Sequence, residues 1–173
     1  WSSDVCSSDL SLASGLENGL VISPGTHSKW VEIKSGKITD FRTYMTGELF
    51  ELLRNHSTLS NATDSSAKLV ASEDFIEGLK ADSSDLTHDL FSIRANWIQG
   101  KSQDASREYL SGLLIGAEIK SAKSWCKTSE ARIVASDSLA DIYVFALAHF
   151  GINASVEDQG NLIKYFVALA KKV

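Results

Sequence analysis

The chain has 173 residues, 43% of them hydrophobic, and a formal net charge of −5. This length and composition suit a globular fold with a substantial core, and they exclude a disordered or fibrous chain. The mild negative charge gives no basic footprint for nucleic acid. No apolar run reaches the roughly 20 residues of a membrane span, so no membrane partner is expected.

The first ten residues differ from the rest of the chain. Residues 1–10 resemble translated sequencing adapter, and we exclude them from the fold prediction. Residues 11–173 are expected to form one lobe of a larger protein. Without Cys6, Cys126 is the one cysteine that remains. It has no intrachain partner, which fits a reducing cytoplasm, and we expect a structural role for it.

Three strands and a helix are predicted first. Short apolar runs predict the strands over residues 20–22, 29–34 and 38–45. Ser35 and Gly36 form a two-residue turn signal between the last two, so the strands should make an antiparallel meander. Helical spacing of apolar residues then begins at Thr46 or Gly47 and ends at about His56.

The middle of the chain is predicted to be helical. Apolar spacing predicts helices over residues 73–80, 86–99 and 104–125. Residues of about 60–103 are expected to form a helical insertion. In the longest helix Gly112 and Gly116 lie four residues apart, so they share a face and allow a neighbouring helix to approach closely.

The last part of the chain alternates strands and helices. The predicted elements are a strand over 132–135, a helix over 138–150, a strand over 154–156 and a closing helix over 159–171. The helix over 138–150 is apolar nearly all round and should be buried. A meander followed by strand–helix crossovers implies an α/β fold, with a mixed sheet and helices on its faces.

This element order, β-β-β-α-(helical insertion)-α-β-α-β-α, resembles that of a ribonuclease-H-like lobe. Actin, hexokinase and related sugar kinases contain two such lobes, with nucleotide in the cleft between them. The resemblance implies one lobe of the actin/hexokinase superfamily.

The loop after the first strand carries the strongest functional signal. It combines a proline that fixes the backbone, a glycine, hydroxyl groups and a lysine. Backbone N–H groups, hydroxyls and a cation suit a phosphate. The predicted phosphate-binding residues are Gly25, Thr26, His27, Ser28 and Lys29. The glycine spacing is not that of a P-loop. An ordinary hairpin turn, with a solvated Lys29, is the alternative.

Three segments together carry a family resemblance. They are residues 24–31 (Pro-Gly-Thr-His-Ser-Lys-Trp-Val), 41–50 (Phe-Arg-Thr-Tyr-Met-Thr-Gly-Glu-Leu-Phe) and 52–57 (Leu-Leu-Arg-Asn-His-Ser). They resemble 2-dehydro-3-deoxygalactonokinase, and residues 90–94 and 109–118 agree with it. The family implies transfer of the ATP γ-phosphate to the terminal (6-) hydroxyl of 2-dehydro-3-deoxy-D-galactonate. Any Mg²⁺ is expected to arrive with the nucleotide.

The resemblance also implies site residues. The turn would hold the ATP phosphates, and the adenosine would lie against a strand–helix junction made of Ala135, Ser136 and Asp137. This junction is usually glycine-rich in the superfamily, and a helix N-cap is the alternative for it here. The residues expected to contact the sugar acid are Thr46, Gly47, Glu48 and Arg94. Among these, Arg94 would pair with the substrate carboxylate, although a surface ion pair is an alternative.

Members of this family are about twice as long, and they begin with a lobe that carries an Asp-x-Gly-Thr motif. That motif is absent from this sequence. We therefore expect the catalytic base in a missing N-terminal half, and no kinase activity from this fragment alone. No metal-ligand spacing is visible. The alternatives are another sugar kinase of the superfamily, or a non-catalytic nucleotide-binding or scaffold domain.

Overall fold

The computed structural model describes residues 17–157. Residues 1–10 and the closing helix predicted over 159–171 lie outside the described residues. The described residues divide into two compact units, one formed by residues 17–44 with 126–157 and the other by Met45–Trp125. The helical insertion expected at about residues 60–103 falls within the second unit.

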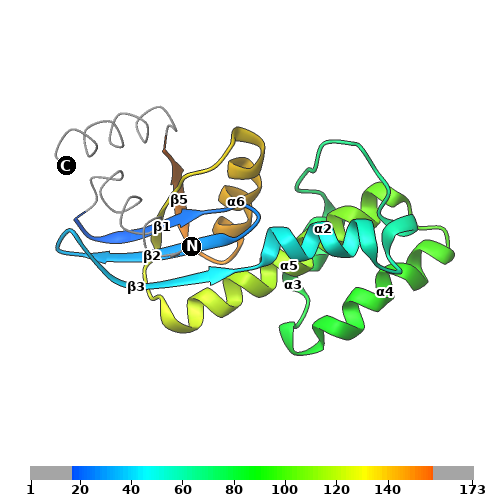
Figure 1. The fold of residues 1–173 in the computed structure, drawn as a ribbon, viewed down its shortest axis with the longest axis horizontal. Helices are drawn as coiled ribbons and strands as arrows, with labels where there is room; N and C mark the ends of the chain where they lie inside the picture. The colour runs from blue at the N-terminus through cyan, green and yellow to red at the C-terminus, as the bar shows by residue number, and fades with distance from the viewer. Residues whose placement is uncertain (1–16, 158–173) are drawn as a thin grey trace. The chain divides into compact units, whose positions relative to one another are not determined.

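A five-stranded mixed sheet forms the first unit, with the strand order β3-β2-β1-β4-β5 (Figure 1). The strands are β1 (Gly19–Ser23), β2 (Ser28–Lys34), β3 (Lys37–Tyr44), β4 (Glu130–Ile133) and β5 (Asn153–Val156). The first three make an antiparallel meander, whereas β4 pairs in parallel with both β1 and β5. The predicted α/β class and mixed sheet are confirmed.

The hairpin between β2 and β3 turns at the two residues predicted from the sequence. Ser35 and Gly36 both have positive φ, 51° and 68°. A two-residue turn of this kind matches the right-handed twist of the strands that it joins. The turn thereby fixes the register of the meander.

Alternation along the strands distributes the core over both faces of the sheet. Val21, Val31 and Ile33 are fully buried and form one cluster. Trp30 precedes Val31 in the strand, so its side chain lies on the other face. There the Trp30 ring meets the Tyr44 ring edge-on, with 6.4 Å between centroids.

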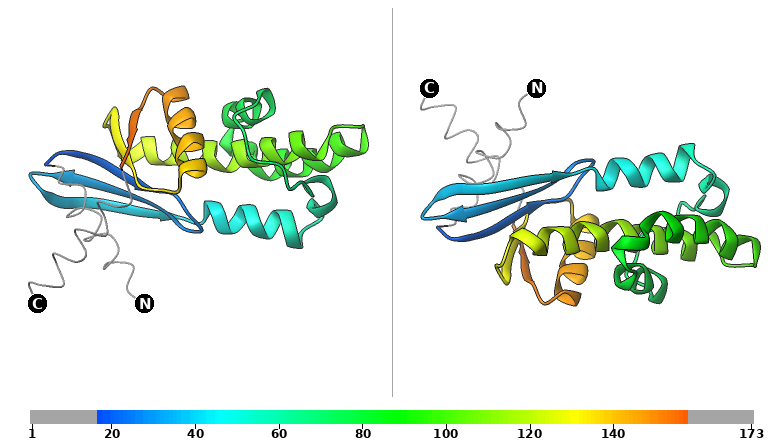
Figure 2. Two further views of the ribbon diagram at one scale, coloured as in Figure 1. Left: turned by 90° about the horizontal axis from the view of Figure 1, so that it is seen from above. Right: turned by 90° about the horizontal axis from the view of Figure 1, so that it is seen from below.

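The helix α6 (Asp137–His149) connects β4 to β5 and packs against both strands (Figure 2). The sequence predicted that this helix, apolar nearly all round, is buried, and most of its apolar side chains are: Ala140, Ile142, Tyr143, Ala146 and Leu147. Phe145 is 38% exposed, whereas Tyr143 and Leu147 on the inner face are buried. One apolar face suffices because the helix covers the sheet from one side only.

The strand predicted over residues 132–135 is misplaced by two residues. β4 begins at Glu130 and ends at Ile133, because these are the residues that find partners in β1 and β5. Pairing, rather than the local apolar run, sets the limits of so short a strand.

Helices make up the second unit, with α5 in contact with the three others. They are α2 (Thr46–His56), α3 (Glu73–Lys80), α4 (Leu86–Ile98) and α5 (Gln103–Trp125), with short 3₁₀ turns η1 (Ser60–Ala62) and η2 (Ser83–Asp85). One buried core of this unit consists of Leu59, Ala62, Ile93, Leu110, Leu113 and Leu114. No helix among the described residues has the length and apolar character needed to cross a bilayer.

Glycines allow α3 and α5 to touch backbone to backbone. A Cβ added at Gly112 would lie 2.1 Å from the carbonyl oxygen of Phe75, and one at Gly116 would lie 2.8 Å from that of Leu79. On the facing helix, a Cβ at Gly78 would lie 2.4 Å from the carbonyl oxygen of Tyr109. The close approach predicted from the spacing of Gly112 and Gly116 is confirmed.

We predict that Gly112→Ala destabilises the protein even though alanine is the better helix former. The new methyl group meets backbone, which cannot rotate away, so the helices must separate at a cost of about 1–3 kcal/mol. Chemical denaturation of the purified chain measures this change. Gly25→Ala is the matched control, because no atom lies within 4 Å of its added Cβ. Equal stability of the two variants would contradict the close packing.

Candidate functional site

Parallel pairing brings two predicted site segments to the end of the sheet at which β1 and β4 finish, which we call its carboxyl edge. Ile22 of β1 lies beside Ile133 of β4, and the N–H of Val134 donates to the Ile22 carbonyl oxygen at 2.9 Å. Neighbouring strands are about 4.8 Å apart. The turn that follows β1 and the loop that follows β4 therefore leave the sheet side by side. In α/β sheets, ligands bind at this carboxyl edge of the parallel strands.

The predicted phosphate turn spans the gap between β1 and β2. Thr26 and His27 are exposed, whereas Ser28 is fully buried as the first residue of β2. The ammonium of Lys29 donates to the His27 carbonyl oxygen at 3.4 Å, so the lysine side chain folds back onto the turn. Space beside Gly25 is open, since nothing lies within 4 Å of an added Cβ. An anion can approach the backbone there without meeting a side chain.

The predicted adenosine segment forms the start of α6. Ala135 is buried, Ser136 is the exposed N-cap residue, and Asp137 is the first helical residue. The Ser136 side chain accepts no capping hydrogen bond from the helix. The first N–H groups of a helix have no intrahelical partner and carry a partial positive charge, which attracts anions. The alternative in which the Ser136 side chain caps the helix is not observed.

One ion pair adjoins the same edge. Arg132 Nη1 lies 2.9 Å from Glu157 Oε1, and the N–H of Glu157 donates to the Ile133 carbonyl oxygen at 2.8 Å. Glu157 follows β5, so all three parallel strands end together here. The contact is partly exposed, and such pairs contribute at most about 1 kcal/mol to stability.

The residues predicted to bind the sugar acid all lie in the second unit. Thr46, Gly47 and Glu48 form the first turn of α2, which has no side-chain N-cap. A carboxylate in this turn is favoured by the helix dipole without any ligand. Arg94 on α4 donates from Nη1 to the Thr58 carbonyl oxygen at 2.9 Å. The structure thus brings Arg94 against the chain that follows α2, where it holds a backbone oxygen.

The sequence analysis missed a cluster of polar groups in this unit. Arg54 on α2 and Arg107 on α5 both donate to the carbonyl oxygen of Ser65, at 2.7 and 2.8 Å. A signal for Arg107 was present in the sequence. It precedes Leu110 and Leu114 at helical spacing, so a charged residue occupies the buried face of α5, where such residues are rare unless paired.

Neither thiol nor metal chemistry is indicated by the described residues. Cys126 is buried, and burial raises the pKa of its thiol, which keeps it protonated and unreactive. Within residues 17–157 no three His, Cys, Asp or Glu side chains are grouped as a metal site.

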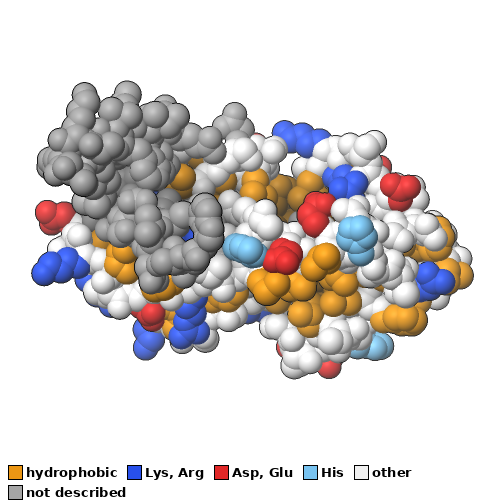
Figure 3. Space-filling model, viewed as in Figure 1, with side chains coloured by type: hydrophobic (Ala, Val, Ile, Leu, Met, Phe, Trp, Pro, Cys, Tyr) orange, Lys and Arg blue, Asp and Glu red, His pale blue; other side chains and the backbone are white. Residues whose placement is uncertain are grey.

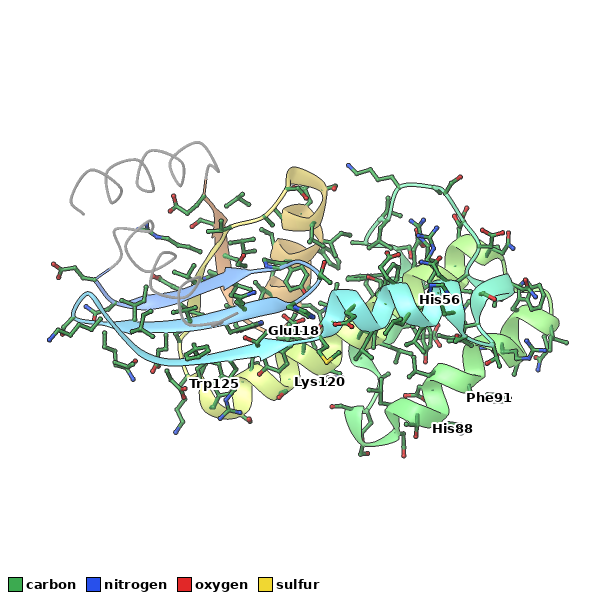
Figure 4. All side chains as sticks on the ribbon, viewed as in Figure 1. His56, His88, Phe91, Glu118, Lys120 and Trp125 are labelled. Atoms are coloured by element: carbon green, nitrogen blue, oxygen red, sulfur yellow. The ribbon has the colours of Figure 1, made fainter. Side chains whose placement is uncertain are left out.

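Lys120 on α5, labelled in Figure 4 together with Glu118, donates to the Ala81 carbonyl oxygen, which links α5 to the end of α3.

Comparison with known proteins decides the family. The model of the 2-keto-3-deoxy-galactonokinase family matches residues 10–166. The chain belongs to this family. The 2-dehydro-3-deoxygalactonokinase of Escherichia coli (strain K12) is 36% identical over 142 residues, which are 80% of this chain and 48% of that protein. A Rhizobium meliloti (strain 1021) protein with the provisional name 2-dehydro-3-deoxygalactonokinase DgoK1 is 32% identical over 164 residues, 91% of this chain and 54% of its own length.

One solved structure agrees with this assignment, and a second shares the fold alone. A crystal structure from Sinorhizobium meliloti, with the same provisional kinase assignment, superimposes with a TM-score of 0.87 at 32% identity, over 96% of this chain and 57% of that one. Component A of (R)-2-hydroxyglutaryl-CoA dehydratase from Acidaminococcus fermentans shares the fold, with a TM-score of 0.54 at 14% identity, over 90% of this chain and 63% of that one. The chain thus spans about half the length of the curated relatives it matches.

We predict that the Ser136 hydroxyl contributes little to the stability of α6. Ser136→Ala should change the free energy of unfolding by less than about 0.5 kcal/mol, because no capping hydrogen bond is lost. Ser72→Ala is the matched variant, since the Ser72 hydroxyl accepts from the Phe75 N–H at 3.2 Å and caps α3. It should cost about 1 kcal/mol. Equal losses in urea denaturation would show that Ser136 is an ordinary cap.

Proposed function

We propose that this chain is the nucleotide-binding part of a 2-dehydro-3-deoxygalactonokinase, a bacterial cytoplasmic enzyme. The complete protein would transfer the ATP γ-phosphate to the 6-hydroxyl of 2-dehydro-3-deoxy-D-galactonate. In this proposal residues 11–173 form the C-terminal, ribonuclease-H-like lobe of the enzyme, with a helical insertion at about residues 60–103. The base that takes the hydroxyl proton belongs to the half of the relatives that this chain does not match.

One observation carries the proposal. The parallel pairing of β1 with β4 brings the turn at Gly25 and the start of α6 at Ser136 to the same edge of the sheet. Both segments present backbone N–H groups, and the space beside Gly25 is open. Phosphoryl transfer depends on donors placed around the charge of the transferred group. We assign the phosphates to Gly25, Thr26, His27, Ser28 and Lys29, and the adenosine to Ala135, Ser136 and Asp137.

The remaining assignments follow the family resemblance. Mg²⁺ would arrive with the nucleotide and be held by its phosphates. Thr46, Gly47 and Glu48 would contact sugar hydroxyl groups. Arg94 remains a candidate for the substrate carboxylate, with one of its nitrogens already engaged by Thr58.

We predict that Gly25→Val in the product of the complete gene lowers kcat/KM for ATP by about 10²–10³-fold, the usual cost of losing a charge-stabilising contact. The branched side chain fills the space in which a phosphate would lie. Because nothing lies within 4 Å of an added Cβ, the melting temperature should stay within a few degrees of wild type. A coupled ADP-release assay with the sugar acid as acceptor gives both kinetic constants.

Asn153→Val provides the control for added bulk. Asn153 is an exposed residue at the start of β5, on the opposite edge of the sheet. This variant should keep wild-type kinetics. If Gly25→Val also keeps wild-type kinetics, the turn at Gly25 does not bind the ATP phosphates. If the wild-type product phosphorylates a neutral hexose in preference to the sugar acid, the substrate assignment is wrong.

A further inference from the structure

Two arginines of the second unit share a single backbone oxygen. Arg54 donates from Nη2 and Arg107 from Nη1 to the carbonyl oxygen of Ser65. The Ser65 hydroxyl in turn donates to Oδ1 of Asp104 in the first turn of α5. Two guanidinium cations therefore converge on one neutral acceptor.

This arrangement leaves strong donors unused. The Nε atoms of Arg54 and Arg107 are both buried, and neither has a hydrogen-bond partner. Arg107 as a whole is only 6% exposed. The hydroxyl of Ser106, the residue before Arg107, is likewise buried without a partner. A buried donor with no acceptor costs about 1–3 kcal/mol, and a charged one costs more.

Burial and a neighbouring cation also bear on Arg107. Burial lowers the pKa of Arg107, and the positive charge of Arg54 lowers it further, whereas Asp104 and Glu108 oppose both effects. The net shift is downward. One arginine would suffice to anchor Ser65, and the second adds repulsion. What the cluster lacks is an acceptor for the two buried Nε–H groups.

We propose that Arg54 and Arg107 form a binding site for the carboxylate of a small organic acid. Each guanidinium presents Nε and Nη as a fork that matches two carboxylate oxygens. At Arg54 the carbonyl oxygen of Ser65 now occupies the Nη2 position of this fork, whereas at Arg107 it lies on Nη1, outside the fork of Nε and Nη2. Residues 63–72, between η1 and α3, contain no helix or strand, so a carboxylate can displace this carbonyl without breaking an element.

A singly charged carboxylate fits better than a phosphate. Asp104 and the buried Glu108 already adjoin Arg107. A dianion placed at the two guanidinium groups would meet repulsion from both carboxylates, whereas a monoanion meets half as much. Resting on the proposed function, the natural occupant is the carboxylate of the sugar acid, which makes Arg54 and Arg107 stronger candidates for this role than Arg94.

The test is a titration of the 173-residue chain, followed through the Nε–Hε signals of its arginines by NMR. We expect 2-dehydro-3-deoxy-D-galactonate to shift the signals of Arg54 and Arg107 saturably. Its methyl ester, which is neutral at that end, should leave them in place. Arg54→Lys and Arg107→Lys should each weaken binding at least tenfold, because lysine keeps the charge but lacks the fork. Arg42→Lys, on the exposed part of β3, is the control and should bind as wild type.

Three outcomes would overturn the site. They are unmoved Nε signals with the sugar acid, equal binding of the methyl ester, and a stronger response to inorganic phosphate than to any carboxylate. Should Arg107→Lys fail to fold, the wild-type titration and Arg54→Lys still decide. Pyruvate separates this question from the kinase assignment, because it carries the same 2-oxo acid end and no 6-hydroxyl. If pyruvate shifts both signals while the complete gene product phosphorylates no sugar acid, the site stands and the proposed function fails.

Discussion

The pairing of β1 with β4 is the constraint on which the candidate nucleotide site depends. These strands are separated by about a hundred residues of chain, yet Leu20, Val21 and Ile22 lie in parallel register with Ala131, Arg132 and Ile133. A shift of β4 by one residue would exchange the faces of the fully buried Ile133 and the partly exposed Arg132. Burial of Ile133 therefore fixes where the two loops that follow the strands emerge. The site geometry is in this sense a by-product of core packing.

The second unit depends on the close packing of two helices. Three glycines, Gly78, Gly112 and Gly116, let the backbones of α3 and α5 touch, so α5 can pass through the centre of its helical unit. The position of α5 in turn places the polar side chains near its start, among them Asp104 and Arg107. Figure 3 shows hydrophobic side chains gathered on the visible face of this unit, and the exposed ones on α2 include Leu49 and Leu52. The apolar pattern of α2 thus extends beyond what its own unit buries.

Local signals in the sequence predicted most of the fold. The turn at Ser35 and Gly36, the helix over 73–80 and the glycine face of the long helix depend on neighbouring residues alone, and each is confirmed. The sequence and the structure differ where distant chain decides the outcome. β4 is placed by its partners, and Phe145 is exposed because α6 covers the sheet from one side. Arg54 and Arg107 were missed because they lie 53 positions apart in the sequence and meet only in the folded chain. They meet at the backbone oxygen of Ser65, and a backbone acceptor cannot be recognised from residue types.

The most direct test of the central claim is an amide chemical-shift map of this chain with ATP and Mg²⁺. The account predicts that amides of residues 25–28 and 136–139 shift together along one saturation curve, while those of Ser35 and Gly36 at the opposite edge of the sheet do not respond. Binding that leaves either of the first two segments unperturbed, or that moves the Ser35 turn instead, would contradict a nucleotide site at the carboxyl ends of β1 and β4.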